Sequence, residues 1–194
     1  MMSLVWLLAA GLATAAPKPQ APVAPAAPVP EGGARLPAAP KPSADHERLD
    51  FLAGTFRFER TTSLPGRPPE RTSGVSENRW ILGNRYLECR SSEGEGANAS
   101  ESVAIYGFDI RRRVYFVILI GSRGTNYQNL DGFYDEPAHS FVLLGKDPGD
   151  GRVPGPKLRQ IVRVDGRDRY SVELFTVAVG RVPQKVIEIT YSRQ

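Results

Sequence analysis

Cysteine and histidine are scarce in this chain, and their scarcity excludes several kinds of site. The 194 residues contain one cysteine, Cys89, and two histidines, His46 and His139. A single cysteine excludes an internal disulfide and a zinc site built from several cysteines. No histidine neighbours Cys89 in the sequence to lower the pKa of its thiol. Cys89 is therefore predicted to be a small buried apolar residue.

The two histidines also limit catalysis and cofactor binding. A hydrolytic triad needs a nucleophile, a base and an orienting group, and the chain has no Gly-x-Ser-x-Gly sequence. His46 lies at the start of the folded part and His139 at a turn, so neither is predicted to face an interior. Asp147 and Asp150 lack the spacing of a calcium-binding EF-hand loop. We therefore predict no catalytic residue, no metal ligand and no cofactor.

The N-terminal part of the chain has little that could build a core. Residues 4–10 are an apolar run too short to span a bilayer, and residues 13–15 are small, which predicts a signal peptide over residues 1–16. No Lys or Arg precedes that run, so a merely apolar N-terminus is the alternative. Sixteen of residues 17–42 are Pro or Ala, which predicts a disordered linker. The prediction is an exported protein, periplasmic or secreted, without stable membrane insertion, whose folded domain spans residues 43–194.

Helical periodicity is nearly absent from that domain. Only residues 44–52 fit a short helix, with Ser43 as its N-cap. The rest consists of short runs rich in Val, Ile, Tyr and Phe, each ended by turn residues. Ten strands are predicted, at 53–61, 71–80, 85–92, 101–108, 113–121, 126–134, 139–146, 158–165, 169–178 and 185–193.

The connections between these strands are too short for crossover helices, so the strands run antiparallel in an up-and-down order. Closing such a sheet on itself removes its exposed edges. The predicted fold is all-β: a ten-stranded antiparallel up-and-down barrel with a short N-terminal helix, closed by pairing of the first and last strands. Strand 113–121 is apolar on both faces, so we expect the N-terminal helix to cover its outer face.

Little net charge lies on the domain. The whole chain has a net charge of +4, and the counts for residues 43–194 leave +2. The only basic cluster, Arg111-Arg112-Arg113, falls in a predicted hairpin turn. A nucleic-acid-binding protein would show a basic face with interleaved aromatic residues, so no nucleic-acid partner is expected.

Alternation with a period of two assigns side chains to the inside of the barrel. It turns aromatic residues inward together with a few polar groups, a mixture that suits a small and mostly apolar ligand with one or two hydrogen-bonding groups. The predicted ligand contacts are Arg60, Asn78, Gln160, Tyr170 and Tyr191. If those polar groups pair with one another, the barrel is instead filled by its own side chains.

The two ends of the domain carry a resemblance to known proteins. Gly54-Thr55-Phe56 and Arg193 resemble the calycin superfamily, whose lipocalins begin with Gly-x-Trp and end with an Arg packed over that Trp; here Phe56 replaces the Trp. The resemblance implies that Gly54, Phe56 and Arg193 close the barrel. Some calycin barrels hold haem on a histidine near the C-terminus, and this chain has none after residue 139.

A closer likeness is to the bacterial lipocalin-like family called domain of unknown function 1579. It rests on the sequences at 46–56, 80–86, 106–109, 132–135 and 186–193. The resemblance implies a lipocalin-like fold and brings no catalytic residues. Three functions remain open: binding of a small apolar molecule in the barrel, a filled-barrel structural or interaction role in the cell envelope, and an enzyme of unknown reaction.

Overall fold

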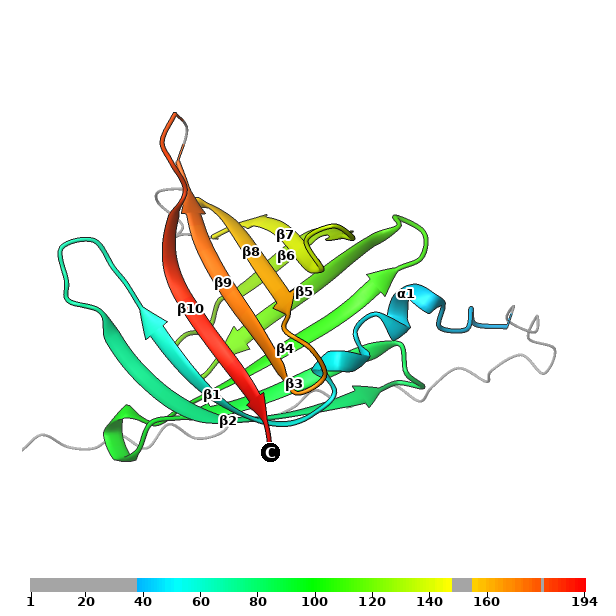
Figure 1. The fold of residues 1–194 in the computed structure, drawn as a ribbon, viewed down its shortest axis with the longest axis horizontal. Coiled ribbons are helices and arrows are strands. Elements are labelled where there is room, and N and C mark those ends of the chain that lie inside the picture. Colours follow the sequence, from blue (N-terminus) through cyan, green and yellow to red (C-terminus); the bar gives the residue numbers. More distant parts are fainter. Residues whose placement is uncertain (1–37, 148–154, 179) are drawn as a thin grey trace, which may run out of the picture. The chain divides into compact units, whose positions relative to one another are not determined.

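Ten antiparallel strands form one closed barrel in the computed structural model, which describes residues 38–147, 155–178 and 180–194. Each strand pairs with the next in the chain, and β10 pairs back to β1 (Figure 1). The predicted barrel is confirmed, and every strand boundary lies within one residue of its prediction. The strands are β1 (Gly54–Thr62), β2 (Glu70–Ile81), β3 (Tyr86–Glu93), β4 (Ser100–Asp109), β5 (Val114–Gly121), β6 (Tyr127–Asp135), β7 (Ser140–Lys146), β8 (Lys157–Val164), β9 (Arg169–Val177) and β10 (Gln184–Arg193).

Local turn chemistry ends the strands where the sequence predicts it. Between β2 and β3, Leu82, Gly83 and Asn84 have φ angles of 51°, 67° and 59°, a left-handed conformation that reverses the chain tightly. Between β4 and β5, the Asp109 carboxylate accepts hydrogen bonds from the backbone N–H groups of Arg111 and Arg112 at 2.9 and 3.1 Å. An Asp that bonds its own turn in this way fixes the hairpin.

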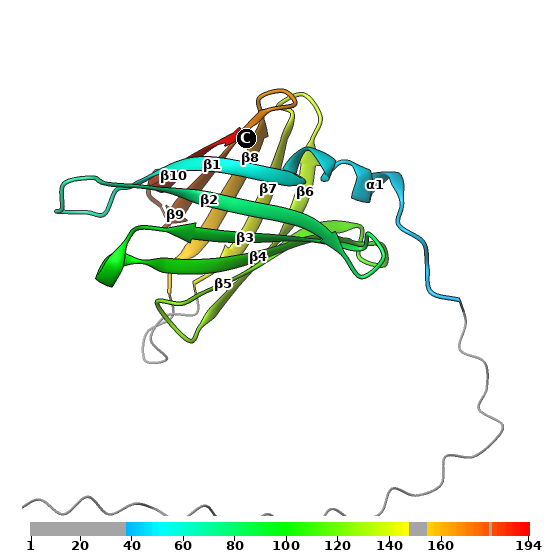
Figure 2. The same cartoon turned by 90° about the horizontal axis from the view of Figure 1, so that it is seen from below.

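The up-and-down order gives the barrel two different ends. The chain enters β1 and leaves β10 at one end, which we call the closed end. At the other end, which we call the loop end, lie the connections β1–β2, β3–β4 and β5–β6, and β7 and β9 end there too. Figure 2 shows α1 (Ala44–Glu47) at the end opposite the β1–β2 connection.

The segment before β1 covers the closed end. The helix predicted over 44–52 is present in two pieces, α1 and the 3₁₀ turn η1 (Asp50–Leu52). Leu49 and Leu52 are each only 1% exposed and belong to the same core cluster as Phe56 and Phe141. Burying these two leucines removes apolar surface from water, so the segment forms a lid packed onto the barrel interior.

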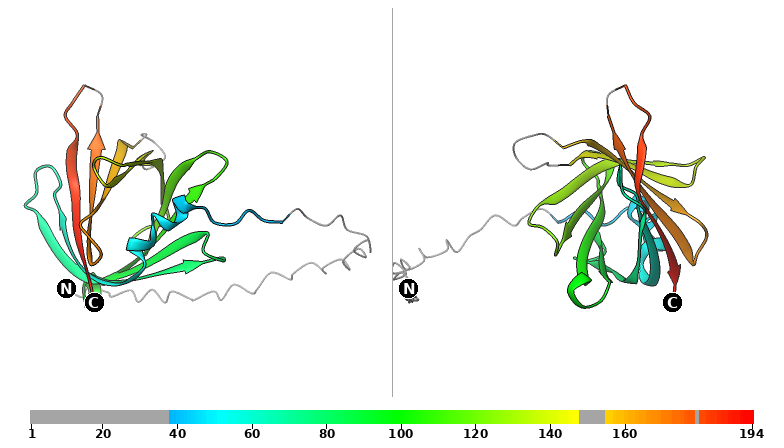
Figure 3. Two further views of the ribbon diagram at one scale, coloured as in Figure 1. Left: turned by 45° about the vertical axis from the view of Figure 1, so that its right-hand side comes forward. Right: turned by 90° about the vertical axis from the view of Figure 1, so that its left-hand side faces the viewer.

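Arg193, at the end of β10, contacts residues at the start of β1. It pairs in register with Phe56, and its guanidinium carbon lies 4.6 Å from the centre of the Phe56 ring. It also donates a hydrogen bond to the Ala53 carbonyl at 2.8 Å. The predicted contact between Arg193 and Phe56 is confirmed. Figure 3 shows the end of β10, marked C, beside the chain that enters β1.

Gly54 provides the space that Arg193 occupies. Its φ is +127°, a conformation that favours glycine. A Cβ atom at this position would lie 2.1 Å from Nη1 of Arg193. The glycine of the Gly-x-aromatic sequence is thus required by both the backbone and the arginine.

The outer face of β5 is covered only in part, which corrects the prediction for strand 113–121. Phe116 is half-buried beside the N-terminal segment, whereas Ile120 at the far end of the strand is 48% exposed. The helix is shorter than predicted and sits at the closed end, so it does not reach Ile120.

The predicted signal peptide at 1–16 and most of the predicted linker at 17–42 lie outside the described residues. Within the described part of the chain, no helix has the length and apolar character needed to cross a bilayer.

Candidate functional site

The inner polar groups nearest the closed end are bonded to one another. Asn78 is 6% exposed; its side-chain amide donates to the Leu52 carbonyl at 2.7 Å and to the Tyr170 hydroxyl at 3.3 Å. Its oxygen accepts a bond from the Ser76 hydroxyl at 2.7 Å. This network ties β2 and β9 to the lid. Buried polar groups without hydrogen-bond partners cost free energy. The network therefore stabilises the fold without any ligand.

Aromatic rings fill the space around this network. The Phe56 ring is fully buried and meets Tyr170 edge-on, with 5.0 Å between ring centres. Tyr170 stacks on Tyr191 at 4.3 Å with an interplanar angle of 9°. Burial raises the pKa of both tyrosines, so their hydroxyls stay neutral. The closed half of the barrel is therefore filled by its own side chains.

Cys89 belongs to this filled half. It is free and only 6% exposed, and burial raises the pKa of its thiol. Burial thus favours the neutral thiol, whereas nucleophiles and metal ligands need the thiolate. The prediction of a small buried apolar residue is confirmed.

The inner face changes character toward the loop end. Along β9, Tyr170 is 3% exposed and Val172 is 9% exposed, while Leu174, the next inward residue, is only half-buried. Along β5, Tyr115 and Val117 are 5% and 0% exposed, and Leu119 is half-buried. On β10, the inward residues Ile187 and Ile189 are half-buried as well. An apolar inner surface is thus accessible from the loop end.

A bonded carboxylate marks the polar side of that accessible surface. Glu93 on β3 forms an ion pair with Arg60 on β1, with 2.9 Å between Oε1 and Nη1. Glu93 also accepts hydrogen bonds from Ser100 at 2.9 Å and Thr72 at 3.0 Å. The Glu93 side chain is 8% exposed and that of Arg60 is 25% exposed. The cluster has no net charge and leaves the arginine within reach of solvent.

The predicted ligand contacts divide between the two halves. All five face the barrel interior. Asn78 and Tyr170 lie in the bonded network, and Gln160, which is 3% exposed, donates to the Tyr106 hydroxyl at 2.9 Å. Tyr191 stacks on Tyr170 in the filled half but is itself half-buried. Arg60 lies at the accessible surface and is half-buried. Whether any of the five contacts a ligand stays a prediction.

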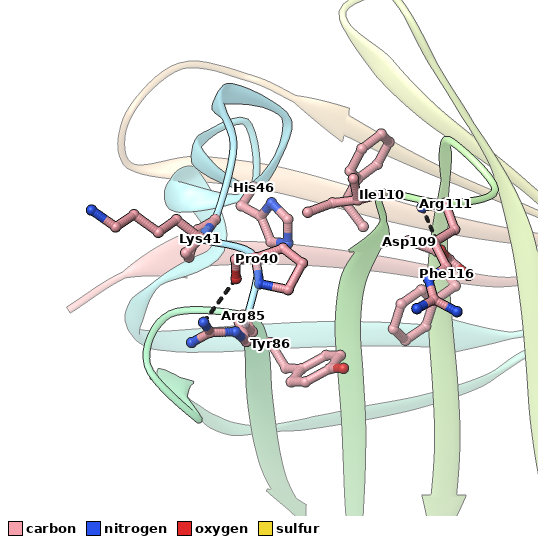
Figure 4. Close-up of a pocket in the computed structure, with 11 residues that line it drawn as sticks. Pro40, Lys41, His46, Arg85, Tyr86, Asp109, Ile110, Arg111 and Phe116 are labelled. Atoms are coloured by element: carbon pink, nitrogen blue, oxygen red, sulfur yellow. Dashed lines mark hydrogen bonds between the residues drawn. The ribbon is translucent and has the colours of Figure 1, made fainter. Parts of the chain in front are cut away.

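A second feature lies on the outside of the barrel, at the closed end. It is a groove of about 410 Å³ lined by residues 40–42, His46, 85–86, 108–111 and Phe116. We call it the N-terminal groove. In Figure 4 the His46 ring lies between Pro40 and Ile110, with Tyr86 and Phe116 on the neighbouring strands. It combines the N-terminal segment with the turn regions β2–β3 and β4–β5.

His46 is held firmly in this groove. It is 4% exposed, and its Nδ1 accepts a hydrogen bond from the backbone N–H of Ser43 at 3.1 Å. Its ring meets Phe108 edge-on at 5.9 Å. Burial lowers the pKa of the imidazole below its usual value, more than the nearby Asp45 carboxylate raises it. With Nδ1 accepting, the hydrogen of the neutral ring is on Nε2.

Glu88 forms another charged cluster on the outer face of the barrel. Its carboxylate accepts bonds from Arg90 at 2.9 and 3.1 Å and from Arg79 at 3.0 and 3.2 Å. The hydrogen bonds from Arg90 lower the pKa of Glu88 most. A carboxylate kept ionised by two arginines is a poor proton donor, so this cluster does not resemble an acid–base site. Within the described ranges, no group of three or more His, Cys, Asp and Glu side chains is arranged to hold a metal ion.

Comparison with known proteins agrees with this architecture. A family model described as "Protein of unknown function (DUF1579)" matches residues 41–193. No curated protein matches the chain.

Two solved structures share the fold. The crystal structure of Rv2717c from M. tuberculosis aligns with a TM-score of 0.57 and 18% identity, covering 78% of this chain and 98% of that one. The S-type phycobiliprotein lyase CPES from Guillardia theta aligns with a TM-score of 0.53 and 9% identity, covering 77% and 92%. At these identities the likeness concerns the fold alone.

Proposed function

The chain belongs to the family of unknown function DUF1579, and from that premise we propose that its barrel binds a small, neutral and mostly apolar molecule at the loop end. Barrels of this size can enclose one small ligand. The observation that carries the proposal is the rising exposure of the inner face toward the loop end. Val117 is fully buried, but Leu119, two residues further along the same strand, is half-buried.

The neutral character of the ligand follows from the polar side of this surface. Arg60 and Glu93 neutralise each other at 2.9 Å, and Thr72 and Ser100 complete the bonding of the carboxylate. A strongly charged ligand would have to compete with this pair. A hydroxyl or carbonyl group needs only one hydrogen bond, which the half-buried guanidinium can donate. The apolar body would lie against Leu174, Ile187 and Ile189.

A structural or interaction role in the cell envelope remains the second candidate. The hydrogen-bonded closed half favours it, because Asn78 and Gln160 already have their partners inside the protein. The two roles differ in one measurable respect: only the first requires the loop end to admit a ligand.

The binding proposal is tested with N-phenyl-1-naphthylamine, a neutral apolar compound that fluoresces when it leaves water. We expect saturable binding that 1-naphthol displaces. Leu174→Trp should fill the accessible interior and raise Kd about tenfold or more, because the larger side chain occupies the ligand's space. Circular dichroism confirms that the variant is folded; Ile189→Phe is the smaller replacement if it is not.

The matched control is Phe175→Trp, the next residue on the same strand. Phe175 faces outward and lies 4.7 Å from the Arg159 guanidinium, a contact that Trp retains. Its Kd should stay within about twofold of the unaltered protein. Absence of saturable binding, or equal weakening by both substitutions, contradicts the proposal and favours the structural role.

We also propose that the protein is exported to the periplasm or secreted, on the strength of the apolar run at 4–10 and the small residues at 13–15. Sequencing the N-terminus of the protein isolated from its native cells tests this. A mature chain that begins near residue 17 supports export, and an intact Met1 contradicts it.

A further inference from the structure

We propose that the N-terminal groove is a second binding site, on the outside of the barrel, for a small molecule with a flat apolar body and one carboxylate. The groove is separate from the accessible inner surface, because it lies at the closed end. Its two rings, Tyr86 and Phe116, are on the opposite face of the sheet from Leu87 and Val117. The site and its ligand class differ from those proposed for the barrel interior.

Two aromatic rings form the apolar part of the groove. Tyr86 on β3 and Phe116 on β5 both pair in register with Gly107 on β4, and their ring centres are 6.1 Å apart. A Cβ atom on Gly107 would lie 2.6 Å from the Phe116 ring and 3.0 Å from the Tyr86 ring. The glycine therefore lets both rings lie over the strand between them. Half-buried rings of this kind suit a flat apolar ligand.

Positive charge surrounds these rings. Lys41, Arg85 and Arg111 line the groove, and within the part of the chain that the structure describes none of them has a carboxylate partner. Asp109 is the one acid of the lining, and its Oδ1 is engaged by two backbone N–H groups of its own turn. With His46 neutral, the lining carries a net charge of +2. An anionic group is the complement that this charge attracts.

The position of Arg85 is fixed before any ligand arrives. Its guanidinium donates to the carbonyls of Pro40 at 2.8 Å and of Leu82 and Gly83 at 3.3 Å (Figure 4). These carbonyls orient the group without neutralising it. A cation held in place loses little freedom when a carboxylate binds, which favours affinity.

His46 adds a neutral donor to the site. Its Nδ1 is occupied by Ser43, and no hydrogen bond to its Nε2 is found within the described ranges. The ring is more than nine-tenths buried and lies in the groove wall. The Nε2–H can therefore donate to a carboxylate oxygen. The volume of about 410 Å³ is within the range of small-molecule sites and too small for a folded partner.

The test compares 2-naphthoate with its neutral counterpart 2-naphthamide by isothermal titration calorimetry on the full chain. We expect saturable binding of the carboxylate and about tenfold weaker binding of the amide, since only the carboxylate meets the cations. Arg111→Gln should weaken naphthoate binding about fivefold and leave the amide unchanged. Ile110→Ser, at a lining residue that is 43% exposed, should weaken both compounds.

The matched control is Arg113→Gln, which removes a charge from the same turn at a residue that does not line the groove. It should change naphthoate affinity by less than about twofold. If Arg113→Gln weakened naphthoate binding as much as Arg111→Gln, the effect would come from general surface charge and the proposal would be overturned. Absence of saturable naphthoate binding would overturn it as well. Loss of naphthoate binding in Leu174→Trp, with no effect of Arg111→Gln, would place the ligand in the barrel and also overturn it.

Discussion

Replacing Phe56 with alanine is expected to lower the free energy of unfolding by about 3–5 kcal/mol, the range for deleting a buried phenylalanine ring. The ring is fully buried between the Arg193 guanidinium at 4.6 Å and the Tyr170 ring at 5.0 Å. Its removal opens a cavity where β1 and β10 close the barrel. Urea denaturation followed by far-ultraviolet circular dichroism measures the loss.

Two companion variants separate the causes of this loss. Phe56→Leu keeps most of the buried apolar volume and should cost about 1–1.5 kcal/mol. Arg193→Ala keeps the ring and removes a cation–π contact worth about 0.5–2 kcal/mol, together with the bond to Ala53, so it should lower the Tm. If Phe56→Ala cost no more than Phe56→Leu, or Arg193→Ala left the Tm unchanged, the closure would not depend on this contact.

Replacing Gly132 with alanine is expected to destabilise the barrel by at least about 3 kcal/mol, the upper part of the range for overpacking. A Cβ atom on Gly132 would lie 1.8 Å from the Val142 carbonyl oxygen and 2.9 Å from the Leu143 Cα. Both are backbone atoms of β7, so no side chain can move aside. The pairing of β6 with β7 would have to open, and loss of soluble folded protein is the extreme outcome.

Gly121→Ala is the matched control for this substitution. Gly121 also lies in a strand, but the nearest atom to its added Cβ is 3.5 Å away, an ordinary contact distance. Its free energy of unfolding should change by less than about 0.5 kcal/mol. If Gly132→Ala changed the free energy of unfolding as little as Gly121→Ala, β6 and β7 would not approach each other as closely at Gly132 as described.

These two positions illustrate what the sequence could and could not predict. The partnership of Phe56 and Arg193 follows from local alternation in two terminal strands and from the resemblance to lipocalins. The strand boundaries follow in the same way, because turn residues and alternation are local properties. The restriction at Gly132 depends on its approach to Val142 across the sheet, which no local pattern encodes.

The polar cluster at the loop end was missed for a related reason. Alternation turns Arg60 inward, but nothing in the sequence of β1 shows that Glu93, two strands away, would meet it. The N-terminal groove joins Pro40, Arg85 and Phe116 from three separate segments. The one feature of the sequence that points to this region is the apolar outer face of strand 113–121. That feature predicts a helix packed over the strand and does not predict a groove.

The accessibility of the interior is also beyond a sequence pattern. Val117 and Leu119 are two positions apart on β5, so both face inward, and both are aliphatic. Only Val117 is fully buried. The difference arises because the lid and the Asn78 network fill the closed half, whereas no equivalent side chains among the described residues cover Leu119. The alternation along a strand identifies which residues face inward. Packing of the surrounding side chains decides which of those residues a ligand could contact.

The central claim is that a small apolar ligand enters the loop end of the barrel and stops at the filled half. A methyl-detected NMR titration with N-phenyl-1-naphthylamine tests it most directly. We expect shifts that saturate at one equivalent in the accessible inner methyl groups of Leu119, Leu174, Ile187 and Ile189. The buried methyl groups of Leu130 and Leu143 should change little. No saturable shifts, or shifts confined to the outer residues Ile110, Ile120 and Leu144, would contradict it.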